Sequence, residues 1–575
     1  MSDTGHGSIG LRLQPFTKLL KSRTTRFNVA DMLALANLMQ GEVDTVKDGA
    51  DPEENLWVPA GYTYFGQFID HDLTFDSTSS LNVADVPNKP GVPDPADESR
   101  IPTNLRTPRF DLDCVYGDGP DAQPFMYAND GATLLYGGTG QPTHQANPDG
   151  MITSETASWD LLRAPNGRAI IGDKRNDENS IVCQIQLGFV KYHNAVVRRL
   201  NGVDAKDWNT PHNLFASAQN EVRWTYQRLV IEDFLPRIVA ADVLADLRNK
   251  TAETRKNSYA LYTEDLRANL PREFVAAAYR FGHSGVRTGY RLNRHTKLSI
   301  FPASNDSNQA SDSLLGFDPL PKHHVIDTWS RFFPMTGPAA DIHMTGRVAA
   351  DNTPHPAPHM QFAYKIDPTL VDPLGVLPPG VAGGGTKEVK DKFRDHEPKL
   401  TLPNPDRPSL ALLNLMRGNS YDLPTGQDVF AALAAKGLNP RPTPATRLVV
   451  RTAAGDKTPP GGGKAVPQFQ WTPIDGALMD ATPLWFYILA EAQAPMVDAI
   501  KPDVDGKFPE TVLLNGPGAL TQLGWVGGRI IAEVFYGILD SDKDSLFNAK
   551  KAMEHITKMP NGATIDHVRQ LLEFG

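Results

Sequence analysis

A histidine flanked by two carboxylates stands in an otherwise apolar, helix-compatible stretch. The segment reads YFGQFIDHDLTFD over residues 64–76, and its polar members are Gln67, Asp70, His71 and Asp72. Burying such groups is costly unless they pair with each other or bind something. If it is buried, the segment supplies a proton acceptor beside oxygen ligands. The simpler interpretation is a solvated helix end.

A second segment offers oxygen atoms suited to a hard cation. In LRTPRFDLDCVYGDGP (residues 105–120), Thr107, Asp111 and Asp113 alternate with apolar residues, which predicts an extended segment with its oxygens on one side. Ca²⁺ binds about six to eight such oxygens. The spacing is not that of an EF-hand loop, and an ordinary acidic turn remains the alternative.

A third pair of segments combines charged residues with a second histidine. GDKRNDEN occupies residues 172–179, and YRFGHSG at 279–285 places His283 after Gly282 in a helical, Ala-rich run. A glycine here would let a bulky planar ligand approach closely. A lone histidine on such a face is more often a satisfied core residue. The chain has no C-x-x-C-H haem-attachment motif.

The combination and order of these segments resemble the animal-type haem peroxidases, the peroxidase–cyclooxygenase superfamily of myeloperoxidase, lactoperoxidase and bacterial relatives. The shared segments are GQFIDHDLTF, TPRFDLDCVYG, GDKRNDEN, YHNAVVRRL, AYRFGHS, LLNLMRGNSYDLPTGQ, TPLWFYILAEA and LGWVGGRIIAEVFYGIL. They span roughly residues 30–550, with the weakest match across 295–400. The resemblance implies an enzyme with haem b that reduces H₂O₂ and oxidises halides, thiocyanate or small phenolic donors through a ferryl haem.

The resemblance also implies roles on the peroxide side of the haem. His71 would be the distal base that takes the peroxide proton and returns it to the departing oxygen. Gln67 lies one helical turn earlier on the same face, where it would hydrogen-bond distal water or halide. Arg175 would stabilise negative charge on the cleaving O–O bond.

On the opposite side of the haem, the resemblance makes His283 the iron ligand. Asn414 would accept the other ring N–H of His283 and so fix its tautomer. Arg417 would pair with a haem propionate, and Arg280 lies one turn before the ligand.

A calcium site is implied as well. Asp72, Thr107, Asp111 and Asp113 match the family's side-chain ligands, and Arg109 stands where a backbone carbonyl is supplied. Cation binding would anchor the helix that carries the distal histidine.

Asp70 and Glu178 match the carboxylates that form ester bonds to haem methyl groups in this family. Asn179 stands where myeloperoxidase has a methionine that makes a third, sulfonium link. We therefore expect no such link, and iodide, bromide, thiocyanate or phenols rather than chloride as donors.

Two other functions are considered. A fatty-acid oxygenase (cyclooxygenase or α-dioxygenase branch) needs a tyrosine three residues before the iron ligand, where this chain has Arg280, with Tyr279 one residue farther away. A non-catalytic, calcium-stabilised adhesion scaffold is the second alternative. Retention of His71, Arg175 and His283 together argues against it.

The bulk composition is that of an ordinary soluble protein. The 575 residues are 40% hydrophobic and 22% charged, with a formal net charge of −10, which disfavours nucleic acid as a partner. No stretch approaches the roughly 20 apolar residues of a membrane helix, and no secretory signal is recognisable. Export by a signal-independent route and a cytoplasmic location both stay open; protein partners are not predicted. Cys114 and Cys183 are too few for a disulfide framework.

The elements that must position these residues are mainly helices. Apolar residues recur at helical spacing in segments 185–200, 214–229, 274–281, 529–540 and 564–575. Asn179–Ser180 is the start signal of the first helix, and Pro236 is expected to close the second. We predict a single large helical domain with long irregular loops and little strand.

Strand signals are few, the clearest being RLVVRT at residues 447–452. Residues 86–103, 367–408 and 452–468 are rich in Pro, Gly and Asp; the last of these reads as a surface insertion. No internal repeat or compositional boundary divides the chain. We therefore predict an N-terminal extension over 1–30 and one peroxidase-like domain over 31–575.

Overall fold

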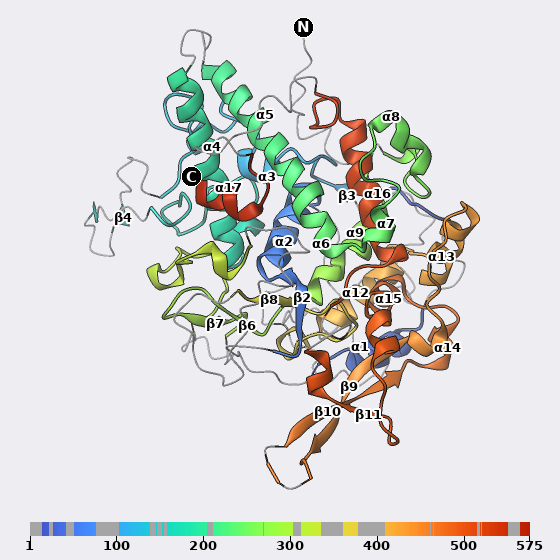
Figure 1. The fold of residues 1–575 in the computed structure, drawn as a ribbon. Coiled ribbons are helices and arrows are strands. Elements are labelled where there is room, and N and C mark those ends of the chain that lie inside the picture. The colour runs from blue at the N-terminus through green and yellow to red at the C-terminus, as the bar shows by residue number, and fades with distance from the viewer. Residues whose placement is uncertain are drawn as a thin grey trace, which may run out of the picture.

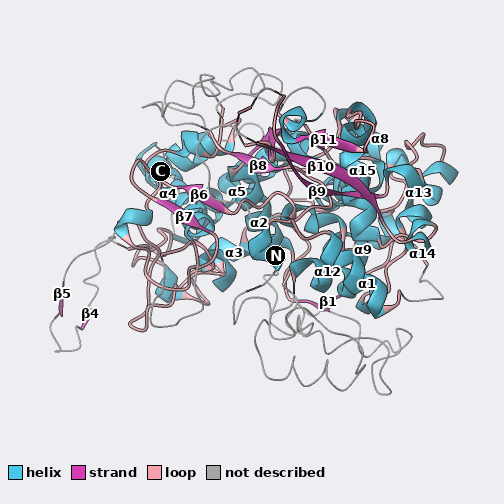
Figure 2. Ribbon diagram, turned by 90° about the horizontal axis from the view of Figure 1, so that it is seen from below, coloured by secondary structure: helices cyan, strands magenta, loops and turns pink. Residues whose placement is uncertain are grey.

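The computed structural model of the chain is mainly helical, as predicted, and its strands are short (Figures 1 and 2). It describes residues 14–21, 27–41, 51–75, 103–137, 145–146, 152–153, 158–203, 211–267, 269–302, 312–334, 360–375, 377, 409–460, 462–463, 465–514, 518, 520–549 and 564–574.

The α-helices are α1 Val29–Leu38, α2 Gly61–Leu73, α3 Asp113–Tyr116, α4 Ser180–Val203, α5 Pro211–Leu229, α6 Leu235–Ile238, α7 Ala241–Leu244, α8 Ala252–Arg255, α9 Arg272–Ala276, α12 Leu410–Ser420, α13 Gly426–Ala435, α14 Gly476–Met479, α15 Leu484–Ala499, α16 Trp525–Ser541 and α17 Val568–Phe574. The 3₁₀ turns are η4 Pro124–Met126, η5 Lys174–Asp177, η7 Lys256–Ser258, η8 Glu264–Leu266, η9 Ala278–His283, η10 Lys322–His324, η11 Trp329–Arg331, η12 Asp372–Gly375, η13 Ala445–Arg447 and η14 Glu510–Leu513.

All strand pairs are antiparallel. In the three-stranded sheet, β10 Val466–Pro473 lies between β9 Val449–Lys457 and β11 Lys507–Pro509. The two-stranded pairs are β1 Gln14–Pro15 with β3 Thr103–Asn104, β2 Glu54–Pro59 with β8 Phe362–Tyr364, β4 Gln145–Ala146 with β5 Ile152–Thr153, and β6 Gly289–Arg291 with β7 Lys297–Ser299.

Helix α2 lies in the interior, where it packs on the long helices α4 and α5 (Figure 1). The ring of Phe68 on α2 stacks on Phe189 of α4 with centroids 4.7 Å apart. Phe65, also on α2, meets Tyr226 of α5 edge-on. Aromatic packing of this kind stabilises both contact and relative orientation. It therefore fixes the rotation of α2 about its own axis.

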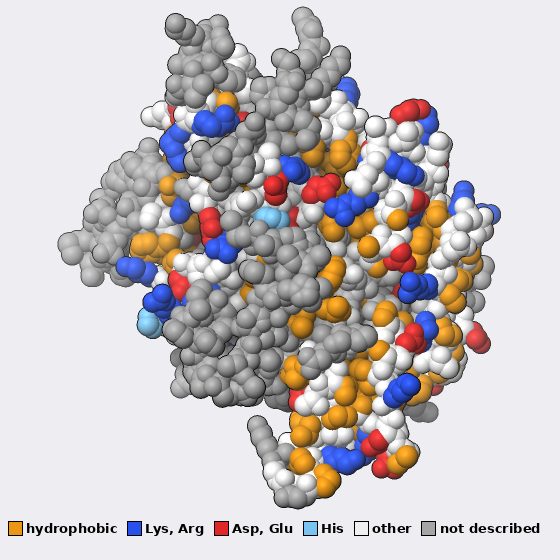
Figure 3. Space-filling model, viewed as in Figure 1, with side chains coloured by type: hydrophobic (Ala, Val, Ile, Leu, Met, Phe, Trp, Pro, Cys, Tyr) orange, Lys and Arg blue, Asp and Glu red, His pale blue; other side chains and the backbone are white. Residues whose placement is uncertain are grey.

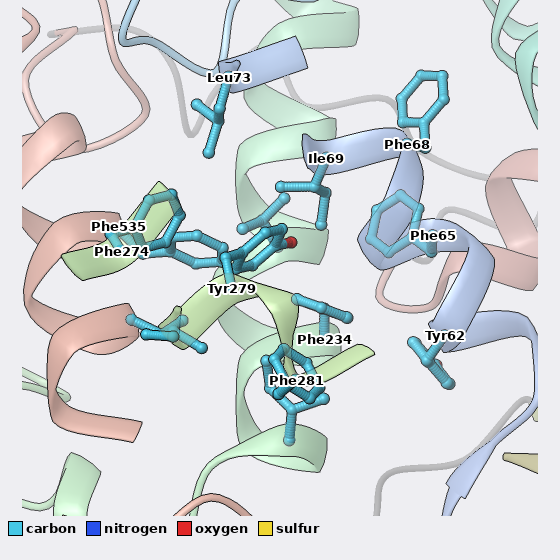
Figure 4. Packing of buried hydrophobic residues seen from close by; sticks show 14 of the residues in the cluster. Tyr62, Phe65, Phe68, Ile69, Leu73, Phe234, Phe274, Tyr279, Phe281 and Phe535 are labelled. Carbon is cyan, nitrogen blue, oxygen red and sulfur yellow. The ribbon is translucent and has the colours of Figure 1, made fainter. Parts of the chain in front are cut away.

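A second aromatic group joins α2 to η9 (Figure 4). Phe274, Tyr279 and Phe535 meet there, with the Tyr279 ring centroid 4.9 Å from that of Phe274 and 5.6 Å from that of Phe535. The Tyr279 hydroxyl donates to the Gly66 carbonyl of α2 at 3.2 Å. The two segments that carry the expected histidines are thus held side by side.

Two helix predictions need correction at their ends. Pro236 does not close the helix that begins at Pro211: the chain continues through a π turn, Val230–Phe234, into α6. A proline in the first turn of α6 costs little, because the N–H group that proline lacks would have no hydrogen-bond partner within α6 at that position. The helix expected over 274–281 is instead α9 followed by the tighter turn η9, with a break at Ala277.

The predicted surface insertion at 452–468 is largely a β-hairpin, since β9 extends to Lys457 and β10 starts at Val466. Of the predicted extension 1–30, residues 14–21 pack on the main body, and Phe16 is 3% exposed. Most of the predicted loops 86–103 and 367–408 lie outside the described residues.

Among the described residues, no helix is long and apolar enough to cross a membrane. On the face shown in Figure 3, acidic and basic side chains of the described residues are interspersed.

Candidate functional site

The buried face of α2 carries the first group of candidate residues. His71 and Asp72 are 4% and 0% exposed, so the alternative of a solvated helix end is wrong. Gln67 and His71 lie one turn apart, and Asp70 accepts from the Thr74 hydroxyl at 3.0 Å. The helix therefore buries polar groups that need partners from elsewhere in the chain.

His71 has a defined tautomer. Its Nδ1 lies 2.7 Å from Oδ1 of Asn176, whose Nδ2 donates to Gln186 at 2.8 Å. This arrangement puts the proton on Nδ1 and leaves the Nε2 lone pair unprotonated. Burial, reinforced by the Arg175 cation, lowers the pKa of His71 to about 4. The ring is therefore neutral near pH 7 and can accept a proton at Nε2.

Arg175 lies in η5 and is held by groups at the end of α2. Its Nη2 donates to the His71 carbonyl at 3.2 Å and also to the Thr74 carbonyl, and it pairs with Asp173 at 2.7 Å. The guanidinium lies 4.7 Å from the centroid of the Phe75 ring. A cation at these helix-terminal carbonyls is favourably placed. It fixes η5 against the turn of α2 that carries His71.

Glu178 completes the group around His71. Gln67 Nε2 donates to its carboxylate, which lies 3.9 Å from His71 Nε2. Asn179 Nδ2 donates to Gln67 Oε1 at 3.1 Å. Burial raises the pKa of Glu178 to about 7, against the opposing effect of Arg175, although 32% of its side chain is accessible. The structure thus brings Gln67, His71 and Glu178 together.

The second histidine, His283, ends η9. Its Nδ1 lies 2.8 Å from Nδ2 of Asn414 on α12, and Arg417 Nη1 donates to Asn414 Oδ1 at 3.4 Å. The resemblance implies the opposite polarity, with Asn414 accepting, which requires the amide to rotate by half a turn. Burial, with Arg280 and Arg417 nearby, lowers the pKa of His283 to about 3. Because Asn414 engages Nδ1, Nε2 is the nitrogen available to a metal.

The carboxylates predicted to bind calcium do converge. Ligand atoms of Asp72, Asp111 and Asp113 lie within 4.8 Å of one another, and neither oxygen of the buried Asp72 has a hydrogen-bond partner. Burial and the two neighbouring carboxylates raise the pKa of Asp72 well above its usual range. The Thr107 hydroxyl donates to Asp111 at 2.6 Å, and Arg109 lies in the same turn.

The predicted extended segment is wrong, however. Residues 107–112 form turns, with Leu112 in the left-handed region at φ 58°, followed by the short helix α3. The bend, rather than strand alternation, brings Asp111 and Asp113 to the same side. Leu112 is fully buried, so its side chain packs this turn into the core.

The donor sets fit the two groups that the resemblance implies. A pair of orphaned oxygens beside two more carboxylates suits a hard cation such as Ca²⁺. The free ring nitrogen of His283, with Arg280 and Arg417 nearby, suits an iron porphyrin that bears propionates. The Nε atom of Arg280 is buried with no partner in the described structure, and a Cβ on Gly282 would meet nothing within 4 Å. An unpaired donor atom of Arg280 and open space beside Gly282 therefore lie close to His283 in the chain.

Three residues that sequence reasoning did not single out organise the site. Asn176 sets the His71 tautomer, and Asp173 and Arg106 pair at 2.6 Å between Arg175 and the carboxylate cluster. Asn176 and Asp173 stand within GDKRNDEN, so their motif was found although their roles were not. No sequence pattern indicated a role for Arg106, apart from its position directly before Thr107.

Comparison with known proteins gives consistent results. Residues 87–321 match the family model described as animal haem peroxidase. The matched region includes Arg175, Glu178 and His283 but begins after His71.

Two curated relatives align with parts of the chain. A peroxidase-like protein of Margaritifera margaritifera is 25% identical over 292 residues, which cover 42% of this chain and 36% of the relative. The dual oxidase of Drosophila melanogaster is 24% identical over 142 residues, covering 24% of this chain and 8% of the relative. The chain thus aligns with about a third or less of the length of these relatives.

Solved structures match across nearly the whole chain. Peroxidase A from Dictyostelium discoideum superposes with a TM-score of 0.51 and 15% identity, covering 94% of this chain and 90% of the other. A fatty acid α-dioxygenase from Arabidopsis thaliana gives a TM-score of 0.45 at 15% identity, covering 94% and 74%. The first of these similarities shows a shared fold.

Proposed function

We propose that this chain is an animal-type haem peroxidase that reduces H₂O₂ and oxidises small anionic or phenolic donors; the match of residues 87–321 to the animal haem peroxidase family model and the peroxidase-like relative support this. The observation that carries the proposal is the arrangement of His71. Asn176 fixes its proton on Nδ1, and the cation of Arg175 is bound to the same turn of α2. A proton acceptor beside a fixed positive charge is what heterolytic cleavage of a peroxide requires.

Haem b would be held by His283 through Nε2, with Arg417 and Arg280 pairing with its propionates. When bound, the haem would supply the oxidising chemistry, and the protein would supply orientation and electrostatics. Asn414 would then turn its oxygen toward His283, since a histidine that ligates through Nε2 carries its proton on Nδ1.

His71 would act on the bound peroxide as base and then as acid. Its Nε2 would take the proton from the near oxygen and return it to the departing oxygen, so that water leaves. Arg175 would stabilise the negative charge that develops as the O–O bond lengthens. Gln67 would position water or halide from the same face of α2.

Calcium would bind to Asp72, Asp111 and Asp113, with the Thr107 hydroxyl and the Arg109 carbonyl as further ligands. Asp70 and Glu178 would form ester links to haem methyl groups: each carboxylate oxygen would bond to a methyl carbon that loses one hydrogen, and one H₂O₂ reduced to water would be the oxidant. Two observations support these assignments: the orphaned oxygens of Asp72 and the position of Glu178 beside His71. With Asn179 in place of a methionine, a sulfonium link is not expected, and iodide, bromide, thiocyanate or phenols are the proposed donors.

The test is an absorption spectrum of the purified protein before and after H₂O₂, together with iodide and phenol turnover. A Soret band that shifts with peroxide, followed by donor oxidation, would support the proposal. Oxygen uptake with fatty acids would favour the oxygenase alternative, which Arg280 disfavours. A haem-binding protein without peroxide turnover would support the adhesion scaffold, and a protein that cannot bind haem would refute the peroxidase.

A further inference from the structure

Two consecutive histidines and an aspartate converge at a site that the proposed peroxidase chemistry does not use. Asp312 Oδ2 lies 2.5 Å from His323 Nε2, and Asp312 Oδ1 lies 2.6 Å from His324 Nε2. One ligand atom from each of the three residues lies within 4.8 Å of the others. The two imidazole rings meet edge-on at 4.5 Å between centroids.

The local fold explains why both rings reach one carboxylate. His323 and His324 end the turn η10, which follows Pro321. His324 is 3% exposed, and its Nδ1 lies 2.9 Å from the hydroxyl of Ser180, the first residue of α4. This contact fixes the ring and leaves Nε2 facing Asp312. His323 is exposed, so its side of the cluster is open to solvent.

We propose that Asp312, His323 and His324 bind a divalent transition-metal ion such as Zn²⁺. Imidazole nitrogen and carboxylate oxygen are the ligands that Zn²⁺ takes, and three protein ligands leave one position for water. The Ser180 hydroxyl would accept the Nδ1 proton of His324, as outer partners of ligating histidines commonly do. Two nitrogens among three ligands favour a late transition metal over Ca²⁺.

Metal binding here would also stiffen the segment that holds Glu178. Ser180 N donates to the Leu314 carbonyl at 2.9 Å, and Gly316 N donates to the Glu178 carbonyl at 2.9 Å. A metal that cross-links Asp312 to His323 and His324 would close the loop that contains these contacts. A cavity of about 700 Å³, lined in part by His323 and His295, gives solvent access on the His323 side.

The first experiment is equilibrium dialysis of the full chain against Zn²⁺, with Ca²⁺ in excess to occupy the carboxylate cluster at Asp72, followed by elemental analysis. We expect one equivalent of Zn²⁺, and at least about tenfold weaker binding in His323→Ala and in Asp312→Asn, since each variant loses a ligand. His295→Ala is the matched control, because it removes an exposed histidine from the same cavity without touching the three ligands. It should bind Zn²⁺ as the parent does.

Hydrogen exchange locates the bound ion. With Zn²⁺ present, the amides of Gly316 and Phe317 should exchange more slowly in the parent and in His295→Ala, but not in His323→Ala. His324 is left unchanged because its burial would confound loss of metal with loss of structure. The proposal is overturned if the parent retains no Zn²⁺, or if His323→Ala and Asp312→Asn both bind it as the parent does. Neither result depends on peroxidase activity.

Discussion

Arg106 donates to Asp173 at 2.6 Å, and the two side chains are only 10% and 0% exposed. The same guanidinium lies 3.0 Å from Asp113, while Asp173 also pairs with Arg175. One buried arginine therefore connects the candidate calcium ligands to the arginine beside His71. A structural change at the carboxylate cluster can therefore reach Arg175 through Arg106 and Asp173.

Replacing Arg106 with alanine should destabilise the protein by about 3–5 kcal/mol, because it removes the arginine that pairs with buried Asp113 and one of the two arginines that pair with buried Asp173. Urea unfolding of parent and variant measures the difference. Arg248→Ala is the control: that arginine is 39% exposed and pairs with Glu232, so its loss should cost no more than about 1 kcal/mol. Equal losses in the two variants would contradict the role given to Arg106.

Removing calcium should lower thermal stability, loosen haem and reduce turnover. Without a cation, Asp72, Asp111 and Asp113 repel one another, and the end of α2 loses its anchor. Calorimetry and the Soret band before and after chelation, with the calcium content verified, provide the measurement. Asp72→Asn should abolish the calcium response, whereas Asp130→Asn, in an unrelated acidic turn, should retain it. An unchanged spectrum and turnover after verified removal would count against the site.

Changing His71 to alanine should slow the reaction with peroxide by about 10²–10⁴-fold while haem stays bound, since the variant loses only the proton acceptor. Stopped-flow absorbance gives the rate, and the Soret intensity of the resting protein gives the haem content. His295→Ala, which removes an exposed histidine, should react as the parent does. If His71→Ala reacts with peroxide at the parent rate, His71 is not the proton acceptor.

The combined variant Asp70→Asn and Glu178→Gln should release its haem on acidic organic extraction after incubation with peroxide. The parent should retain pigment, because ester bonds survive the extraction that removes free haem. The two single variants should each keep one link. If parent and double variant release haem equally, the ester assignment is wrong.

Apolar periodicity predicted the long helices α4 and α5, whereas the helix expected over 274–281 breaks at Ala277 before it reaches His283. The sequence could not predict the turn at Leu112, since a left-handed leucine is dictated by tertiary burial rather than by local preference. The motif in α2 identified His71 but not its partner Asn176. That hydrogen bond joins residues more than a hundred positions apart, and nothing in local spacing encodes it.

Glu491 gives a prediction about the elements that support His283. It lies on α15, whose Trp485 donates to the Arg280 carbonyl at 3.2 Å, and it caps α16 by accepting from Val526 N at 2.9 Å. Burial raises the pKa of Glu491 from 4.5 to about 7, outweighing the backbone hydrogen bonds that lower it.

A folded-state pKa above the unfolded value means that the protonated carboxyl stabilises the fold below pH 4.5, and that this stability is lost as the pH rises through about 7. Glu491→Gln stays neutral at every pH. The free energy of unfolding of this variant should therefore rise relative to that of the parent by about 3 kcal/mol as the pH increases from about 5 to about 8. Asp498→Asn removes a half-exposed carboxylate from the same helix and should show no comparable gain. Unfolding curves of the three proteins that run parallel with pH would show that Glu491 is already ionised in the folded state.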